Sequence, residues 1–198
     1  IPFASFCFFS RDDNFYLNDS VNKIGPTIQF LKKNNPNINF LCMYPGDIWD
    51  LNSTWNNKES INKYSNNYDK IMPIKIDNKI IDFSKIQEVS KQFIKITKKN
   101  NNLFSLYNFM NKKNYELYFF ITDTNTKCRF DFKNGLVEIN KIDLSKANCT
   151  LSSDSLYQLF NSGYGYDALI IGGRFESNKS LLKNLNKIFK FQAKNYQN

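Results

Sequence analysis

The chain has 198 residues, of which 41% are apolar and 16% aromatic, and its formal net charge is +9. These totals exclude a disordered chain and predict a globular fold of one large or two small domains. No apolar run approaches the roughly 18 residues of a membrane span, so we expect no membrane-spanning segment. The sequence contains no histidine, which excludes a Ser-His-Asp triad and a His-ligated zinc site within these residues.

Two further features of the composition predict the class of partner and the compartment. The lysines are scattered, and arginine, the preferred reader of phosphates and bases, is scarce, so we expect no nucleic-acid partner. The four cysteines, Cys7, Cys42, Cys128 and Cys149, lie too far apart to form a CxxC motif. Apolar neighbours flank Cys7 and Cys42, which predicts buried free thiols, and we expect a reducing, cytoplasmic location.

The first 51 residues predict a strand, a helix and a second strand. Ile1–Ser10 is apolar enough for a strand, and its abrupt start predicts a chain cut from a longer polypeptide. Pro26 suits the first turn of a helix, because its fixed φ and missing N–H cost nothing there. Ile38–Met43 is a short apolar stretch that ends in Tyr44-Pro45-Gly46-Asp47. This order of elements predicts an α/β unit with a parallel sheet.

Residues 52–83 are polar and irregular in pattern. The interval contains Trp55-Asn56-Asn57-Lys58 and Tyr64-Ser65-Asn66-Asn67-Tyr68. We expect a linker or long surface loop here, with a short strand near Ile71–Ile76.

The remaining residues, 84–198, predict an α+β domain. Ser84 and Gln87 have the spacing of a capping box at the start of a helix. An apolar stripe follows at helical spacing, and we expect it in the core; it would line an apolar pocket only if the helices and sheet fail to close. Its members are Ile86, Val89, Phe93 and Ile96.

Several shorter elements complete this predicted domain. Asn134-Gly135 indicates a hairpin, because both residues tolerate positive φ. In chain order we expect a helix at Leu103–Met110, strands at Tyr115–Asp123, Lys127–Phe132 and Leu136–Ile139, a fourth strand ending at Thr150-Leu151, a helix capped by Ser152 or Ser153, a strand at Ala168–Ile171, and a last helix from Asn178 that turns Leu181, Leu182, Leu185, Ile188 and Phe189 inward.

Two sets of acidic residues are candidates for chemistry. Asp47 follows the carboxyl end of a predicted strand, where open α/β sheets keep their ligand crevices. A tight turn with proline and glycine in their usual places is the alternative. Asp12, Asp13 and Asp19 offer oxygen ligands for a hard cation, or they form a solvated acidic loop.

Two stretches of the first 51 residues carry a family resemblance. The sequence IPFASFCFFSRDDNFYLNDSVNK, followed by a helix and then by NFLCMYPGDIWDL, resembles the C-terminal part of metallo-β-lactamase-fold proteins. The resemblance is to the branch that contains CMP-N-acetylneuraminate hydroxylase and uncharacterised metallo-hydrolases. The later stretch DSLYQLFNSGYGYDALIIGGRFESNKSLLKNLNKIF resembles their terminal segment, and it is also similar to sterol-carrier-protein-like domains, in which helices cover a sheet around an apolar tunnel.

The resemblance implies a fold and a reaction. Residues 1–51 would be the C-terminal piece of an αββα sandwich, and residues 84–198 a sterol-carrier-protein-like α+β domain. The parent enzyme would be a hydrolase, or a Rieske-type hydroxylase of a sugar nucleotide or another small anionic metabolite. Its zinc or iron, and the 2Fe-2S cluster of a hydroxylase, would be held by upstream residues. The chain by itself would then carry no cofactor, would need the upstream part of the same polypeptide as its partner, and would be inactive.

The same resemblance implies roles for particular residues. Asp47 and Tyr44 would line the catalytic site, and Tyr44 stands where wider relatives place their last metal-ligand histidine. The implied substrate-binding residues at the rim are Asn14, Tyr16, Asn18, Asp19 and Gly46. An alternative from another class stays open, in which residues 84–198 form a non-catalytic module that binds a lipid or other apolar ligand.

Overall fold

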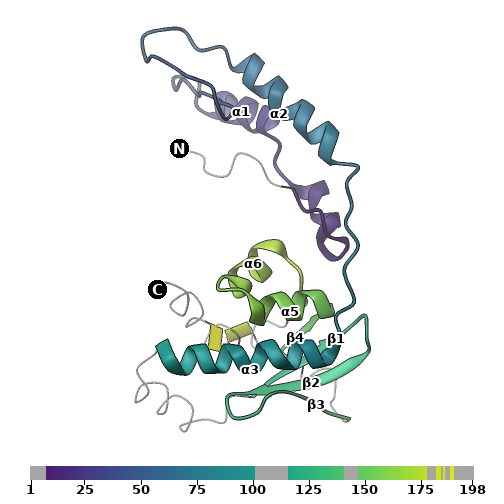
Figure 1. Cartoon of the computed structure of the whole chain (residues 1–198). Helices are drawn as coiled ribbons and strands as arrows, with labels where there is room; N and C mark the ends of the chain where they lie inside the picture. Colours follow the sequence, from purple (N-terminus) through teal and green to yellow (C-terminus); the bar gives the residue numbers. More distant parts are fainter. Residues whose placement is uncertain are drawn as a thin grey trace. The chain divides into compact units, whose positions relative to one another are not determined.

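A computed structural model of the chain describes residues 8–100, 116–140 and 147–177, together with residues 182, 183, 185, 188 and 189 of a C-terminal helix. The fold is mixed α/β and contains one four-stranded mixed sheet (Figure 1). The chain divides into two compact units, an N-terminal unit of residues 1–77 and a C-terminal unit of residues 78–198. The division therefore lies inside the interval 52–83 that the sequence predicts to be a linker or loop.

The N-terminal unit is built from helices. Its elements are the 3-10 helix η1 (Asp12–Ser20) and the α-helices α1 (Ile24–Asn34) and α2 (Asn57–Ile71). A single parallel bridge joins Arg11 to Ile76, and the Ile76 amide donates to the Ser10 carbonyl at 2.7 Å. Among residues 8–77 the structure contains no strand, so the predicted strand-helix-strand unit is corrected there. Most of the strand expected at residues 1–10 lies outside the described residues.

The segment predicted as a strand at Ile38–Met43 pairs with no other strand among the described residues. Side chains take the place of a neighbouring strand. The Asn57 side chain accepts from the Cys42 amide at 2.7 Å and donates to the Phe40 carbonyl at 2.6 Å. The Trp55 indole donates to the Cys42 carbonyl at 2.7 Å. Because these backbone groups are satisfied by side chains, no sheet is needed to bury them.

Helix α2 occupies 15 residues of the interval 52–83 that was predicted to be a linker or loop, and it corrects that expectation. Asn56 caps the helix, since its side chain accepts from the Lys58 amide at 3.0 Å. Tyr64 and Tyr68 are buried on the same face of the helix, with Ile61 half-buried beside them. The helix was missed because its buried stripe is made mostly of tyrosine rather than of aliphatic residues.

The C-terminal unit contains the sheet. Its strands are β1 (Leu117–Ile121), β2 (Thr126–Asp131), β3 (Gly135–Glu138) and β4 (Cys149–Leu151), in the spatial order β3-β2-β1-β4. β2 is antiparallel to both β1 and β3, and β4 runs parallel to β1. The four strands lie within or beside the ranges that the sequence predicts.

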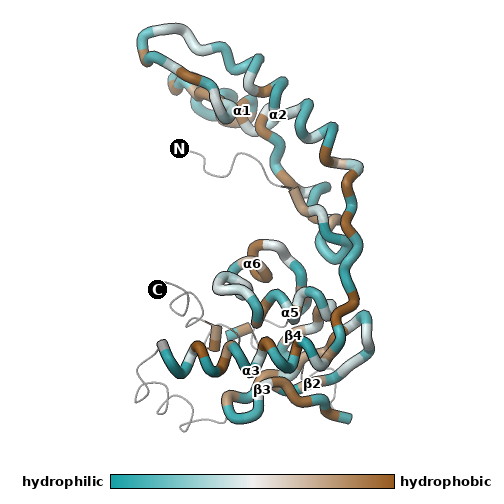
Figure 2. Tube along the Cα trace, in the orientation of Figure 1, coloured by the Kyte–Doolittle hydropathy of each residue, from teal (hydrophilic) through white to brown (hydrophobic). Residues whose placement is uncertain are grey.

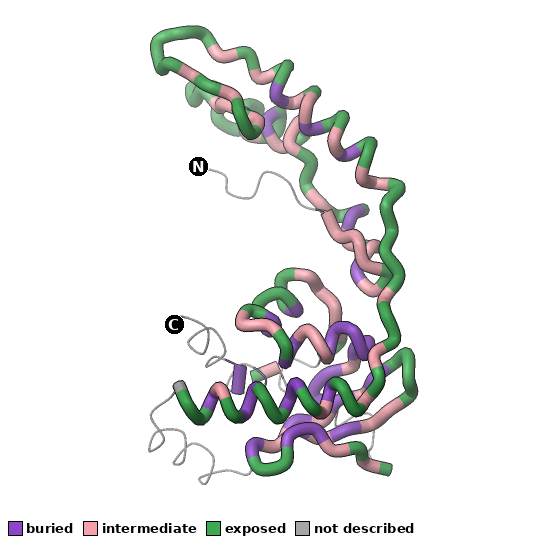
Figure 3. The backbone as a smooth tube through the Cα atoms, viewed as in Figure 1, coloured by how far each residue is buried: buried purple, intermediate pink, exposed green. Residues whose placement is uncertain are grey.

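Helices α3 (Phe83–Asn100) and α5 (Ser153–Asn161) pack against each other and against one face of the sheet (Figure 1). The apolar stripe of α3 is core, as expected: Ile86, Val89 and Phe93 are buried, whereas Ile96 is half-buried. Figure 3 shows the buried and exposed sides of α3 alternating along the helix. The helix begins before the predicted cap Ser84, and the Asp82 carbonyl accepts from the Ile86 amide at 3.3 Å.

The centre of this core is aromatic. The Phe93 ring lies 5.6 Å from the Phe160 ring and 5.4 Å from the Phe189 ring, measured between centroids. Phe130 packs 5.0 Å from Phe160. Leu185, Ile188 and Phe189 of the last helix are buried, which confirms their predicted inward direction. Leu181, Asn178 and the helix predicted at Leu103–Met110 lie outside the described residues.

Residues Ala168–Ile171 form part of a helix, α6 (Gly165–Gly172), where the sequence predicts a strand. Gly165 allows this helix to start close against α5, because a Cβ at that position would lie 2.6 Å from the Leu159 carbonyl oxygen. Gly173, with φ of +58°, ends the helix in the left-handed conformation. A short run of branched apolar residues fits a strand or a buried helix equally well, and packing decides between them.

The turn between β2 and β3 also differs in detail from the prediction. Asp131 pairs with Gly135, so three residues form the loop, and of Asn134 and Gly135 only the glycine has positive φ, at +77°. The Asp131 carboxylate accepts from the Asn134 amide at 2.7 Å and stabilises this loop. The predicted cap of α5 is confirmed at Ser152, whose side chain accepts from the Ser155 amide.

Candidate functional site

The turn at Tyr44-Pro45-Gly46-Asp47 was the strongest candidate in the sequence. The Asp47 amide donates to the Tyr44 carbonyl at 2.8 Å, which closes a four-residue turn. Pro45 occupies the second position and Gly46, with φ of +92°, the third, as a type II turn requires. The local sequence therefore accounts for the turn without reference to a ligand.

The Asp47 carboxylate is held by three donors. One oxygen accepts from the Lys63 ammonium at 2.8 Å, and the other accepts from the Ser60 hydroxyl at 2.6 Å and the Tyr44 amide at 2.7 Å. The hydrogen bonds from Lys63, Ser60 and the Tyr44 amide lower the Asp47 pKa to about 2. The carboxylate is therefore ionised at neutral pH and fastens the turn to α2.

The Tyr44 side chain is held in the same way. Its hydroxyl accepts from the side-chain amide of Asn67, and its ring packs edge-on against the Tyr64 ring with centroids 4.9 Å apart. The Lys63 ammonium lies 5.9 Å from the centre of the Tyr44 ring, a cation–π arrangement.

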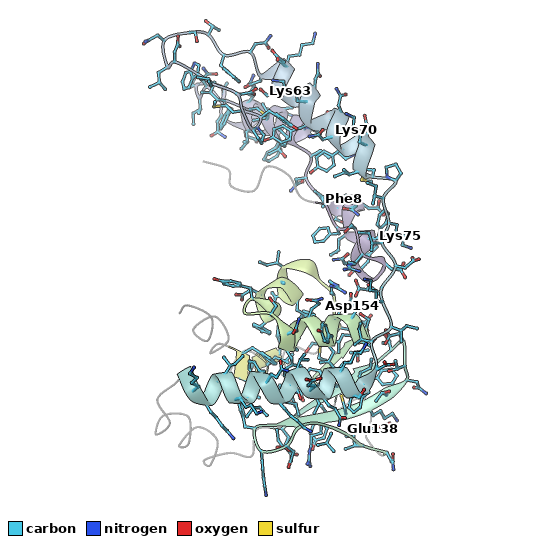
Figure 4. All side chains as sticks on the ribbon, in the orientation of Figure 1. Phe8, Lys63, Lys70, Lys75, Glu138 and Asp154 are labelled. Carbon is cyan, nitrogen blue, oxygen red and sulfur yellow. The ribbon has the colours of Figure 1, made fainter. Side chains whose placement is uncertain are left out.

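Sequence reasoning missed the residues that hold Tyr44 and Asp47. All three lie on one face of α2, at the helical spacings of three and four: Ser60, Lys63 and Asn67. This spacing was a usable signal, but it was overlooked because the interval was interpreted as a loop. Lys63 is labelled on α2 in Figure 4. It also pairs with Glu59 at 3.1 Å, one helical turn earlier.

Four of the five predicted rim residues lie on η1, whereas Gly46 lies in the turn before Asp47. Asn14 and Asn18 are buried, whereas Tyr16 and Asp19 are exposed. The Asn18 side chain accepts from the Phe9 amide at 2.9 Å and donates to the Phe9 carbonyl at 2.7 Å. Asn18 thus joins η1 to the segment before it, and its side chain is occupied by hydrogen bonds to the Phe9 backbone.

The two predicted groups lie in different parts of the N-terminal unit. Asp47 is paired with Lys63, and Asp12 of η1 is paired with Lys75 at 2.5 Å. Figure 4 shows Lys63 and Lys75 well apart along this unit. The catalytic and substrate-binding roles implied by the resemblance stay predictions.

The donors around Asp47 do not fit the zinc or iron that the resemblance implies for the parent. Both carboxylate oxygens already accept protein hydrogen bonds, and the nearest charged side chain is the cation Lys63. Within the described ranges no three His, Cys, Asp or Glu side chains gather closely enough to hold a metal. We therefore derive no step through a metal at this turn.

A second candidate lies in the C-terminal unit, beside α6. A hollow of about 270 Å³ is lined by Tyr166, Asp167, Ile170, Ile171 and Leu182. Ile171 is 76% exposed, and Ile170 is also exposed, so apolar side chains face solvent at its wall. The Tyr166 ring stacks on Phe189 at 5.6 Å, which ties the hollow to the core.

Comparison with known proteins gives no relative: no family model, curated protein or solved structure matches the chain. Of the helices in the described part of the chain, none combines the length and the apolar character needed to cross a bilayer.

Proposed function

We propose that the C-terminal unit is a non-catalytic module that holds a small apolar ligand in the hollow beside α6. The observation that carries this proposal is the cluster of solvent-facing aliphatic side chains around a concave surface, because contiguous exposed apolar surface marks binding sites. Ile170 and Ile171 supply the wall, and Leu182 lies between the hollow and the core.

The size of the hollow limits the ligand. Its volume of about 270 Å³ lies just below the roughly 300 Å³ at which pockets for drug-sized molecules begin. The aromatic core inside the sheet and helices is closed around Phe93 and Phe160, so the ligand enters from the surface rather than through a tunnel. A short alkyl chain or a single ring system fits these limits.

Charge at the rim selects among apolar ligands. Asp167 is exposed at the hollow, and no ion pair among the described residues involves it. A neutral ligand or one with an amine at its end is therefore favoured, whereas a carboxylate at the same end is repelled.

The test compares an alcohol, an amine and a carboxylate of equal alkyl chain length as competitors of the uncharged dye Nile red on the full chain. We expect displacement by the amine and the alcohol, and weaker displacement by the carboxylate. Ile171→Ser should weaken dye binding, and Asp167→Asn should remove the preference against the carboxylate. Ile48→Ser, at an exposed position of the N-terminal unit, is the matched control. Equal dye binding by the Ile171→Ser variant and the wild-type protein would reject the proposal.

The enzymatic function implied by the resemblance is the second reading, and it stays a prediction for this chain. It is less well supported because the side chains assigned to catalysis, Asp47 and Tyr44, already have partners within the N-terminal unit. Its own test is hydrolysis of a sugar nucleotide by the chain joined to an upstream metal-binding segment, with Asp47→Asn as the variant expected to lose turnover.

A further inference from the structure

The net positive charge of the chain belongs to one unit. Residues 1–77 carry eight basic and eight acidic side chains, whereas residues 78–198 carry nineteen basic and ten acidic side chains. The whole formal charge of +9 thus belongs to the C-terminal unit. The lysines themselves occur in both units, seven in the first and seventeen in the second, but only the second has an excess of basic over acidic side chains.

Within that unit the outer face of α3 concentrates the charge. The helix buries the stripe described above and turns its other side to solvent (Figure 3). Figure 2 shows hydrophilic residues recurring along this helix between the apolar ones. Five exposed lysines form what we call the α3 basic face: Lys85, Lys91, Lys95, Lys98 and Lys99. Glu88 is the other exposed charged residue of the helix.

Few acidic side chains neutralise the positive charge of the α3 basic face. Glu88 is the sole acidic residue of α3, and its carboxylate accepts from Gln92 at 3.3 Å. Between residues that the structure describes, no ion pair involves Lys91, Lys95 or Lys98. From Lys85 to Lys99 the charges extend about 20 Å along the helix, at 1.5 Å per residue.

We propose that the α3 basic face docks the C-terminal unit on an anionic lipid surface. A row of lysines on a rigid helix is complementary to a flat, delocalised negative surface, and each lysine near such a surface contributes about 1 kcal/mol. This inference rests on α3 and not on the hollow beside α6, so it goes beyond the proposed ligand site. Either proposal can fail while the other holds.

The chemistry of the face favours lipid over nucleic acid. Its cations are all lysine, which acts as a point charge, and none is arginine, whose planar fork reads phosphates and bases. The two aromatic residues of α3, Phe83 and Phe93, are half-buried and buried, so the exposed side of the helix offers no ring on which a base could stack.

The test measures co-sedimentation of the full chain with two kinds of vesicle, phosphatidylcholine alone and phosphatidylcholine with phosphatidylserine. We expect binding only to the vesicles with phosphatidylserine, and loss of binding as salt shortens the range of the charges. The triple variant Lys91→Gln/Lys95→Gln/Lys98→Gln should bind roughly 100-fold more weakly, about fivefold for each lysine. Glutamine and lysine have similar helix propensities, so α3 should still form, which circular dichroism checks.

A matched control removes the same charge from the N-terminal unit. Lys32→Gln/Lys33→Gln/Lys58→Gln changes three exposed lysines outside the face and should bind vesicles as the wild type does. Ile171→Ser, which alters the hollow, should also leave vesicle binding unchanged, and so separates this inference from the ligand proposal. No binding to phosphatidylserine vesicles, equal losses in the two triple variants, or tighter binding to a single-stranded oligouridine than to the vesicles would each overturn the inference.

Discussion

Lys63 and Asp47, sixteen residues apart in the sequence, meet at 2.8 Å and join a turn to the middle of a helix. The Asp47 side chain is only 9% exposed, so this pair is more sheltered than the usual surface ion pair. Because the Ser60 hydroxyl and the Tyr44 amide complete the set of donors, the carboxylate organises the contact between residues 44–47 and α2.

Stability of the N-terminal unit should depend on this carboxylate above pH 4. The Asp47 pKa falls from 3.8 to about 2 in the folded chain, chiefly through the Lys63 hydrogen bond. The contribution of the ionised group is therefore fully present above pH 4 and is lost as the pH falls towards 2. Asp47→Asn should unfold more easily than the wild type at pH 7. The difference between the two proteins in the free energy of unfolding should shrink between pH 4 and pH 2.

Tryptophan fluorescence measures this effect selectively, because both tryptophans, Trp49 and Trp55, belong to the N-terminal unit. Asp69→Asn, an exposed change on the same helix, is the control and should leave the profile close to that of the wild type. A difference between Asp47→Asn and the wild type that persists unchanged at pH 2 would contradict the expected role.

Phe93→Ala should strongly destabilise the C-terminal unit. The ring is 1% exposed and packs against Phe130, Phe160 and Phe189, so its removal leaves a cavity that rigid neighbours cannot fill. The free energy of unfolding should fall by about 3–5 kcal/mol. Urea denaturation followed by circular dichroism measures this, and Ile80→Ala, at an exposed site of the same unit, should change it by less than about 0.5 kcal/mol.

Gly165→Ala should loosen the packing of α6 on α5. The added methyl group would lie 2.6 Å from the Leu159 carbonyl oxygen and would also overlap the Gln158 carbonyl oxygen, and backbone atoms cannot move aside cheaply. We expect a loss of about 1–3 kcal/mol in the free energy of unfolding. The exposed change Asn161→Ala, at the end of α5, serves as the control. A variant at least as stable as the wild type would show that α6 does not require this close approach.

The buried cysteines should be unreactive in the folded chain. Burial raises the pKa of Cys128 to about 12 and also raises the pKa values of Cys149 and Cys42, so burial disfavours the reactive thiolate at all three sites. Ellman's reagent should label native Cys7→Ser protein slowly and label all three remaining thiols in urea. Rapid stoichiometric labelling of that variant without urea would show that one of these sites opens readily.

Local sequence signals were sufficient for much of the C-terminal unit. The stripe from Ile86 to Phe93 predicted a core helix, and the hairpin after Asp131 and the cap at Ser152 were found from turn and capping chemistry. These features depend on periodicity and on side chains that bond to nearby backbone, so a short stretch of sequence contains the information.

The tertiary structure decided the cases in which two local readings were equally good. Residues 168–171 became a helix because α5 supplies the surface on which they pack, and Ile38–Met43 formed no strand because Asn57 and Trp55 satisfy its backbone groups. The sequence by itself determined a globular α/β chain without histidine and with a basic charge. The bond between Asp47 and α2 followed only from the fold, because it joins residues that lie far apart in the chain. The fold likewise showed that the five lysines of α3 face solvent, because packing fixes which side of the helix is buried.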